Sequence, residues 1–312
     1  MPDRSGFLVL PWPGVGSEAE AEVEVSEGRG DMLLRGGALL GAVLVICVTA
    51  LRRWIGGGVC RSGERQDGKT VLVTGANTGI GKETCREMAR RGARVVMACR
   101  DLSRADQAAE DIRKSTGNGN VVVRHLDLAS LYSVRQFAKD FLDSEDRLDI
   151  LINNAGVMMC PKWLTEDGFE TQFAVNHLSH FLLTNLLLPK LKSSAPSRVV
   201  TVSSIAHRGG SGVSSFCVHP GVIRTELGRH VEGWFPLLGV LLRLPAMLLM
   251  KTPRQGSQTS LYCAITPGLE EQSGSYFSDC AVKEVAPEGR DDEVADRLWR
   301  ESALLVGIKD TC

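Results

Sequence analysis

The sequence predicts an α/β fold: a doubly wound parallel sheet with helices on both faces. Short apolar runs alternate along the chain with longer segments of helical periodicity, and strands buried on both faces of a parallel sheet read as such continuous runs. The first run also leads into a glycine-rich turn and then a helical pattern, which is the order of elements in a βαβ unit. The predicted strands are residues 71–73, 95–98, 121–123, 150–152, 199–202 and 213–218, and the predicted helices are residues 82–91, 102–115, 131–141 and 169–191.

The first 31 residues are acidic and carry no hydrophobic pattern of either helical or strand period. Their glutamates are spaced along an alanine and valine background and include Glu18, Glu20, Glu22, Glu24 and Glu27. Such a segment buries too little apolar surface to offset the entropy lost on ordering it. We therefore expect disorder over residues 1–31.

An uncharged stretch follows, from residue 36 to residue 51. Together with Leu33, Leu34 and Arg35 it would form a helix about 28 Å long, close to the ~30 Å of a bilayer core. We therefore expect a transmembrane anchor over residues 32–53. A cleaved signal peptide fits less well because the stretch begins late and follows an acidic region, and a buried core helix would lie outside the predicted sheet unit.

Basic residues are concentrated after this span. They are Arg52, Arg53, Arg61, Arg65 and Lys69, whereas Arg29 and Arg35 lie close to its start. The positive-inside rule then places the folded domain in the cytosol. Nine cysteines without framework spacing, and the lack of any Asn-x-Ser/Thr sequon, agree with a reducing compartment.

The composition fits one domain of ordinary size plus an additional segment. The 312 residues are 43% hydrophobic and carry a formal net charge of −1. This balance gives no basic surface for nucleic acid. The six histidines are scattered and no residues have metal-ligand spacing, so no metal site is expected.

The glycine-rich turn after the first strand consists of Gly75, Ala76, Asn77, Thr78, Gly79, Ile80 and Gly81. Glycines permit a tight turn and let the backbone approach a pyrophosphate, whose charge is met by the free amides of a helix N-terminus. Strand, turn and helix in this order favour a dinucleotide-binding Rossmann fold over a plain glycine-rich turn.

The residue after the second strand bears on the choice of dinucleotide. An arginine at this place accommodates the 2′-phosphate of NADP, whereas an acid bonds the ribose hydroxyl of NAD. Arg100 ends this strand, which favours NADP(H). Two alternatives remain: Arg100 as a solvated strand-end charge, and the adjacent Asp101 as a competing acid.

The connection between the fifth and sixth strands is unusually short. The fifth strand leads to Ser203 and Ser204, and only residues 205–212 separate them from the next strand. Parallel neighbouring strands need a crossover of a dozen or more residues, usually a helix. The sequence therefore predicts that one crossover helix is missing.

The pattern Thr-Gly-x-x-x-Gly-Ile-Gly resembles that of the short-chain dehydrogenase/reductase family. Matches to other family motifs follow in family order at Asp127, Asn153-Asn154-Ala155-Gly156, Asn176, Ser203-Ser204 and Pro220-Gly221 with Thr225. The resemblance covers residues 66–308. Within the family, residues 98–101, 153–160, 168–171 and 276–280 are most similar to the membrane-anchored retinol dehydrogenases, which reduce retinal with NADPH.

This resemblance implies further cofactor contacts. Asp127 would contact the adenine, although it equally suits the N-cap of the helix that starts near Ser130. Asn153, Ala155 and Gly156 would form the floor beneath the nicotinamide. Pro220, Gly221 and Thr225 would contact its carboxamide, although Pro-Gly alone is only a turn signal.

The resemblance also implies a set of catalytic residues that this chain holds only in part. In the family a tyrosine donates the proton, a lysine four residues later lowers its pKa, a serine orients the carbonyl and an asparagine supports a water relay. Ser204 and Asn176 match the serine and the asparagine, with Ser203 as the alternative to Ser204. The tyrosines are Tyr132, Tyr262 and Tyr276, and no lysine stands four residues after any of them. The catalytic Tyr and Lys are therefore absent.

By resemblance the chain is expected to be an NADP(H)-dependent retinol/retinal oxidoreductase of the endoplasmic reticulum membrane, facing the cytosol and catalytically impaired. The simplest account is the loss of roughly 40 residues from an ordinary family member. The apolar segment 233–250 would then be a lid for a small apolar substrate such as retinal or retinol. A steroid or lipid-aldehyde reductase, and a noncatalytic nucleotide-binding or partner-binding isoform, are the alternatives.

Overall fold

The computed structural model describes residues 18–202, 212–223, 225, 227 and 248–308, with only the backbone at residues 18–36 and 288. Ser203, Ser204 and most of the predicted lid lie outside the described residues. The chain divides into one unit that ends at Arg53 and a second that begins at Trp54. The folded domain thus begins earlier than residue 66.

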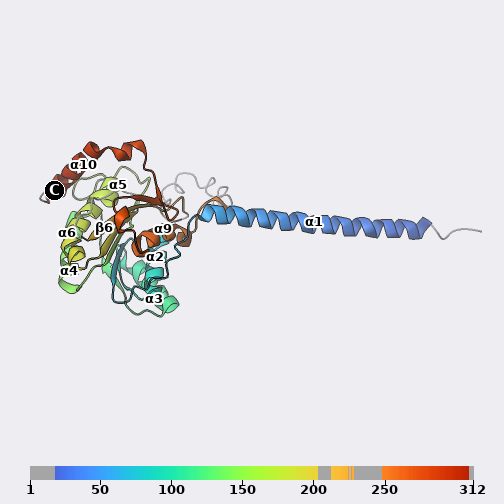
Figure 1. Cartoon of the computed structure of the whole chain (residues 1–312), viewed down its shortest axis with the longest axis horizontal. Coiled ribbons are helices and arrows are strands. Elements are labelled where there is room, and N and C mark those ends of the chain that lie inside the picture. Colours follow the sequence, from blue (N-terminus) through green and yellow to red (C-terminus); the bar gives the residue numbers. More distant parts are fainter. Residues whose placement is uncertain (1–17, 203–211, 224, 226, 228–247, 309–312) are drawn as a thin grey trace, which may run out of the picture. The chain divides into compact units, whose positions relative to one another are not determined.

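The first unit is helical. Helix α1 extends from Glu18 to Gly56 (Figure 1), so residues 18–31 are helical and the expectation of disorder is wrong for them. Glutamate, the commonest residue of this stretch, is a good helix former and can extend a helix that the apolar residues continue. Within α1, Gly37–Gly56 has the length and composition that a membrane span needs, with a mean hydropathy of 1.9.

The second unit is built on one sheet in the order β3-β2-β1-β4-β5-β6-β7-β8. The first seven strands are parallel, and β8 pairs antiparallel to β7. The strands are β1 (Thr70–Thr74), β2 (Arg94–Cys99), β3 (Val121–His125), β4 (Ile150–Asn153), β5 (Ser197–Val202), β6 (Val213–His219), β7 (Tyr276–Ser278) and β8 (Ala281–Lys283). The predicted doubly wound sheet and its six strands are confirmed.

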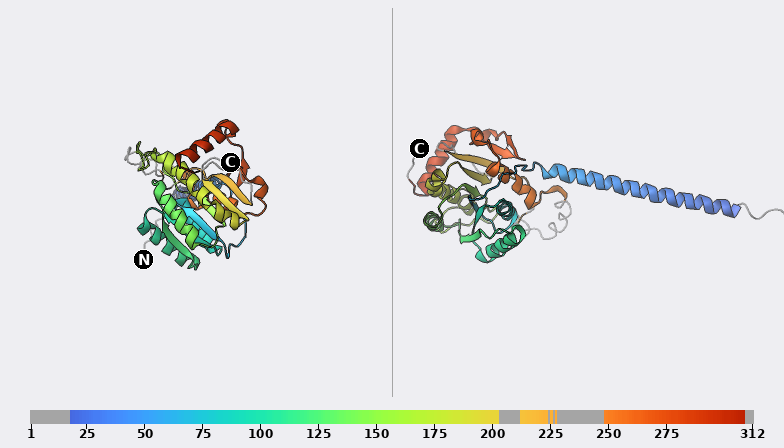
Figure 2. Two further views of the ribbon diagram at one scale, coloured as in Figure 1. Left: turned by 90° about the vertical axis from the view of Figure 1, so that its left-hand side faces the viewer. Right: turned by 60° about the horizontal axis from the view of Figure 1, so that its bottom comes forward.

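Helices cover both faces of this sheet (Figure 1 and Figure 2). One core cluster joins the sheet to α2 (Gly79–Arg90), α3 (Leu102–Thr116) and α9 (Pro253–Ile265). The other joins the opposite face to α4 (Leu131–Ser144), α6 (Ser179–Ser193) and α10 (Asp292–Leu305). Two short 3₁₀ helices, η3 (Glu270–Gln272) and η4 (Pro287–Arg290), lie near the C-terminal strands.

The sequence predicted one long helix over residues 169–191, and this prediction is wrong because the helix is not continuous. It is divided into α5 (Thr171–Phe173), the π-helical turn η1 (Ala174–Leu178) and α6. A π-turn inserts one residue into the helix and often marks a functional site. Here the turn contains Asn176, one of the two predicted catalytic residues.

Strands β5 and β6 are direct parallel neighbours, paired from Ser197↔Val213 to Val202↔Val218. Helix α2 connects β1 to β2, α3 connects β2 to β3, and α9 lies between β6 and β7. In contrast, only residues 203–212 are available to lead from the end of β5 back to the start of β6. This is shorter than the crossover that parallel neighbours normally require.

Candidate functional site

The predicted binding residues gather at the carboxyl ends of the central strands. In the strand order, β1 lies between β2 and β4, so the sheet changes winding direction between β1 and β4. Open α/β sheets bind ligands at this switch point. The glycine-rich turn follows β1, and the segment that begins with Asn154 follows β4.

The glycine-rich turn needs glycine for two physical reasons. Gly75 has a φ of 63° and Gly79 a φ of 57°, in the left-handed region that favours glycine. A Cβ on Gly75 would lie 2.8 Å from the Cα of Ala155, and a Cβ on Gly81 would lie 2.5 Å from the carbonyl oxygen of Gly75. The two loops therefore pack directly backbone to backbone.

The loop after β6 reaches the same place. A Cβ on Gly79 would lie 3.2 Å from Cγ2 of Thr225. Three of the predicted groups, namely the glycine-rich turn, the loop after β4 and Thr225, are thus adjacent. They surround the N-terminus of α2, whose free amides suit a pyrophosphate.

Thr74, the last residue of β1, holds two of these loops together. Its fully buried hydroxyl accepts hydrogen bonds from the amides of Asn154 (2.9 Å) and Ala155 (3.0 Å). It also lies 2.9 Å from Nε2 of His180. Because both acceptor sites of this hydroxyl are used, it must donate its own hydrogen bond. Nε2 of His180 is therefore unprotonated and accepts that hydrogen bond.

The proton on His180 is then placed on Nδ1, which lies 3.3 Å from the carbonyl oxygen of Asn176. A chain of hydrogen bonds thus leads from the floor of the glycine-rich turn to the π-turn. The sequence predicted no role for Thr74 or His180. Their signal is weak: Thr74 precedes the first glycine, and His180 stands one helical turn after Asn176.

The side chain of Asn176 braces the loop after β4. Its Oδ1 accepts from the amide of Val157 (2.8 Å), and its Nδ2 donates to the carbonyl of the same residue (2.9 Å). The side chain of Asn153 is buried, and its Nδ2 donates to Thr184 of α6 (3.0 Å). Both side chains therefore support the site through hydrogen bonds to neighbouring protein groups.

Hydrogen bonds define the local surroundings of the two acidic residues that follow β2 and β3. Asp101 caps α3 by accepting from the amide of Arg104 (3.1 Å), so its carboxylate is already engaged, and Arg100 is exposed beside it. The N-cap of α4 is Ser130, so Asp127 is not the helix cap. Instead Oδ1 of Asp127 accepts from the amide of Ala129 (2.9 Å).

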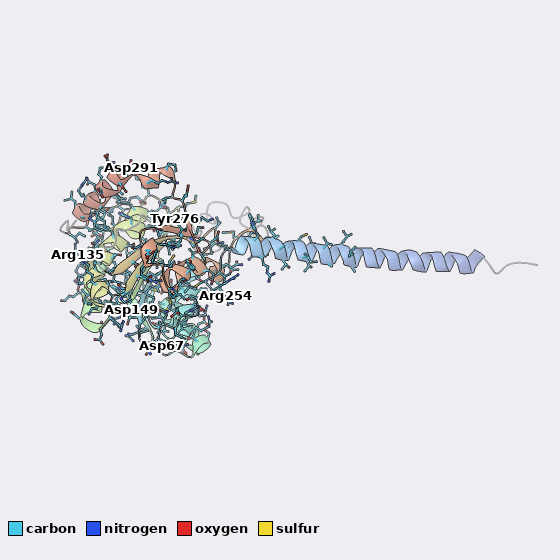
Figure 3. The ribbon with its side chains drawn as sticks, in the orientation of Figure 1. Asp67, Arg135, Asp149, Arg254, Tyr276 and Asp291 are labelled. Atoms are coloured by element: carbon cyan, nitrogen blue, oxygen red, sulfur yellow. The ribbon has the colours of Figure 1, made fainter. Side chains whose placement is uncertain are left out.

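None of the three tyrosines is placed to donate a proton at this site. Tyr132 is 69% exposed on α4, and Tyr262 packs against Phe277 in the core. Tyr276 lies on β7 (Figure 3), where burial raises the pKa of its hydroxyl. A proton donor that works near neutrality needs the opposite shift.

Burial of His180 should make the stability of the domain depend on pH. Burial lowers the pKa of His180 to about 4, from a value near 6.5 in the unfolded chain. Above pH 6.5 protonation of His180 therefore does not reduce the free energy of unfolding. As the pH falls from 6.5 toward 4, that free energy decreases by about 3 kcal/mol in total. The His180→Asn variant is expected to flatten the pH dependence of thermal unfolding in this range.

The exposed His125 at the end of β3 provides the control, since His125→Asn should leave the dependence unchanged. Some dependence should persist in His180→Asn, because burial also lowers the pKa of His177. An unchanged slope in His180→Asn would contradict the assignment of a neutral, buried histidine.

Comparison with known proteins agrees with this arrangement. Residues 69–217 match the short chain dehydrogenase family. The chain is 48% identical to human retinol dehydrogenase 12, over 85% of this chain and 95% of that protein. It is also 48% identical to human retinol dehydrogenase 13, over 83% of this chain and 91% of that protein.

Solved structures share the fold. A protein of Mycobacterium paratuberculosis, 31% identical, superposes with a TM-score of 0.60 over 81% of this chain and 98% of its own. A gluconate 5-dehydrogenase of Beutenbergia cavernae with bound NADP, 22% identical, superposes with a TM-score of 0.56 over 69% of this chain and 96% of its own. The sequence matches, the sheet order and the convergence of loops at the switch point lead to one conclusion: this chain belongs to the short-chain dehydrogenase family, in its retinol dehydrogenase subgroup.

Proposed function

We propose that this chain is an NADP(H)-binding member of the retinol/retinal oxidoreductases that lacks the segment needed for turnover. The observation that carries the proposal is the direct pairing of β5 with β6 across residues 203–212. No tyrosine or lysine lies in that interval. The residues around the glycine-rich turn would hold the nucleotide, whereas the interval between β5 and β6 contains neither the family's proton donor nor the cation that would activate it.

The alignments support the loss of one segment. The alignment with human retinol dehydrogenase 12 extends over 305 residues but takes in 85% of this 312-residue chain, which is about 265 residues. About 40 aligned residues of the relative, the difference between 305 and 265, therefore have no counterpart here. An alignment of 319 residues with bovine dehydrogenase/reductase SDR family member 13, covering 89% of this chain, leaves a similar difference. A crossover helix with its loops has this length.

The described residues suit NADPH. The glycine-rich turn brings backbone amides to the pyrophosphate, and the exposed Arg100 would receive the 2′-phosphate because the neighbouring acid, Asp101, already caps α3. When bound, NADPH supplies the hydride for reduction of an aldehyde. The chain must supply the proton, and a general acid must lie within hydrogen-bonding distance of the carbonyl oxygen to do so.

We further infer that the substrate from which the site evolved is a small apolar molecule such as retinal or retinol. The retinol dehydrogenase relatives and the apolar composition of residues 233–250 support this assignment. Steroid and lipid-aldehyde substrates share the same apolar character. The apolar span in α1 and the basic residues after it support an anchor at residues 32–53 in the endoplasmic reticulum membrane, with the domain in the cytosol.

A noncatalytic nucleotide-binding isoform is the second candidate function. It is favoured by a specific contrast: Gly75 lies against Ala155 and Gly79 against Thr225, although the family's tyrosine and lysine are absent. Such a chain would bind NADPH without consuming it. Partners could then respond to the loaded form through the exposed surface of the domain.

Nucleotide preference tests the proposal independently of turnover. The Arg100→Ala variant is expected to lose about 10- to 150-fold in affinity for NADPH, because a charge-assisted contact with the 2′-phosphate contributes about 1.5–3 kcal/mol. Its affinity for NADH should stay within about twofold. Titration of nicotinamide fluorescence measures both, with Arg90→Ala on the exposed end of α2 as the control. Equal losses for the two nucleotides would contradict the assigned role of Arg100.

A further inference from the structure

The turn between β7 and β8 is held in an unfavourable backbone conformation. Ser278 pairs with Ala281, and the two residues between them, Asp279 and Cys280, have φ values of 53° and 57°. This is the geometry of a type I′ turn, which normally contains Asn-Gly because both central residues need a positive φ. Non-glycine residues remain in this region only where their surroundings impose it, so the contacts of this turn are informative.

Asp279 is the centre of those contacts. Its Oδ1 lies 2.5 Å from Nζ of Lys251, and the side chain of Lys251 is only 10% exposed. The pKa of Asp279 is accordingly lowered, chiefly by its hydrogen bond with Lys251. The carboxylate of Asp279 is therefore ionised at neutral pH.

The segment that enters the domain after α1 is fitted around this aspartate. A Cβ on Gly57 would lie 1.9 Å from Oδ1 of Asp279, and a Cβ on Gly58 would lie 2.0 Å from its carbonyl oxygen. Gly57 also has a φ of 66°. Two consecutive glycines are thus required where the chain leaves α1, which ends at Gly56.

Lys251 also contacts the Pro220-Gly221 loop, which is predicted to bind the cofactor. A Cβ on Gly221 would lie 3.0 Å from both Cδ and Cε of Lys251, so the stem of the lysine lies directly against the Pro220-Gly221 loop. The backbone of Lys251 continues the contact: its amide donates to the carbonyl of Val222 (2.9 Å), and the residue forms a parallel bridge with Ile223. One side chain therefore joins the loop after β6 to the tip of the β7–β8 hairpin.

We propose that Lys251 and Asp279 are positioning residues that hold the Pro220-Gly221 loop in the geometry that receives the nicotinamide end of the cofactor. Through Gly57 and Gly58 the same ion pair ties that loop to the segment that follows the apolar helix. The inference rests on the proposed function, since it assigns a task to the same cofactor site. Neither residue needs to touch the reacting atoms, because each acts through the loop that Lys251 supports.

Two ligands distinguish this role from a general effect on stability. NADPH has a nicotinamide end, whereas 2′,5′-ADP carries only the adenosine and its phosphates. Asp279→Asn preserves the shape and suits a positive φ, and Lys251→Met preserves the length of the stem without the charge. Both variants are expected to weaken NADPH binding about tenfold and to change 2′,5′-ADP binding by less than about twofold.

The exposed ion pair between Glu284 and Arg290 lies close by in sequence and supplies the matched control, because Glu284→Gln should leave both affinities unchanged. Lys251→Arg keeps the charge and is expected to recover most of the NADPH affinity lost in Lys251→Met. Equal weakening of both ligands, or no change in either, would overturn the proposal.

Hydrogen exchange gives a second test that needs no nucleotide. In Asp279→Asn the amides of residues 57–58 and of residues 221–223 should exchange faster together, while those of α4 remain as in the unchanged chain. If only one of the two segments responds, the proposed connection is wrong. Should the unchanged chain bind neither NADPH nor 2′,5′-ADP, the proposed function fails, and the exchange experiment still decides whether the ion pair joins the two segments.

Discussion

Insertion of a family-type segment containing Tyr-x-x-x-Lys between Ser204 and Val213 is expected to give a chain that reduces all-trans-retinal with NADPH, whereas the unchanged chain should show no turnover above background. A positioned general acid contributes about 10²–10⁴-fold to such a reaction. Free tyrosine has a pKa near 10, so the neighbouring lysine is needed to bring it into the working range. Microsomes that contain each protein, assayed for retinol formation, provide the measurement.

The inserted segment would also restore the helix that normally covers the connection between β5 and β6, so folding must be separated from chemistry. The control is the same insert with phenylalanine in place of its tyrosine, which should restore the fold and NADPH binding but not turnover. Equal activity of the unchanged and the repaired chain would mean that another residue supplies the proton. The explanation based on the short β5–β6 connection would then be wrong.

Thr74→Val is expected to give the largest loss of stability among single substitutions at the site. Valine has nearly the shape of threonine but cannot accept the hydrogen bonds from the amides of Asn154 and Ala155 or donate to His180. Buried groups that lose their partner cost about 1–3 kcal/mol each. A total of about 3 kcal/mol or more would lower the melting temperature by about 6–12 °C in a domain of this size.

Thermal unfolding of the detergent-solubilised protein measures this loss. Added NADPH should reduce the difference in melting temperature between the variant and the unchanged chain only if the loops can still close on the nucleotide. Thr116→Val at the end of α3 is the control, since that hydroxyl bonds only locally, to Ile112 and Asn118. It should lower the melting temperature by no more than about 3 °C. Similar losses in the two variants would argue against Thr74 as the residue that joins the loops.

The elements that the sequence predicted well are those with strong local patterns. The six long strands are continuous apolar runs, and the structure extends each by only one or two residues at an end. The glycine-rich turn was identified because its chemistry depends on residues that are adjacent in the chain. In contrast, β7 and β8 are three residues long and too short to show any period.

The features that were missed depend on contacts between distant parts of the chain. The hydrogen bond from Thr74 to His180 joins residues 106 positions apart, and no local pattern indicates it. Asn176, which lies in the π-turn, likewise bonds to Val157, 19 positions away. For Asp127 the sequence left an adenine contact and a helix N-cap open, and the structure gives the cap to Ser130. The capping of α3 by Asp101 was not expected, because it depends on the position of the Arg104 amide.

The close fit of Gly57 and Gly58 around Asp279 has a practical consequence for truncated, soluble versions of the domain. A protein that begins at residue 66, where the family motifs start, would also lose the hydrogen bond from the amide of Cys60 to Gln258 of α9 (3.1 Å). It would leave the hairpin tip without the backbone that encloses it. A shortened protein intended for crystallisation should therefore begin before Gly57 and carry no substitution at either glycine.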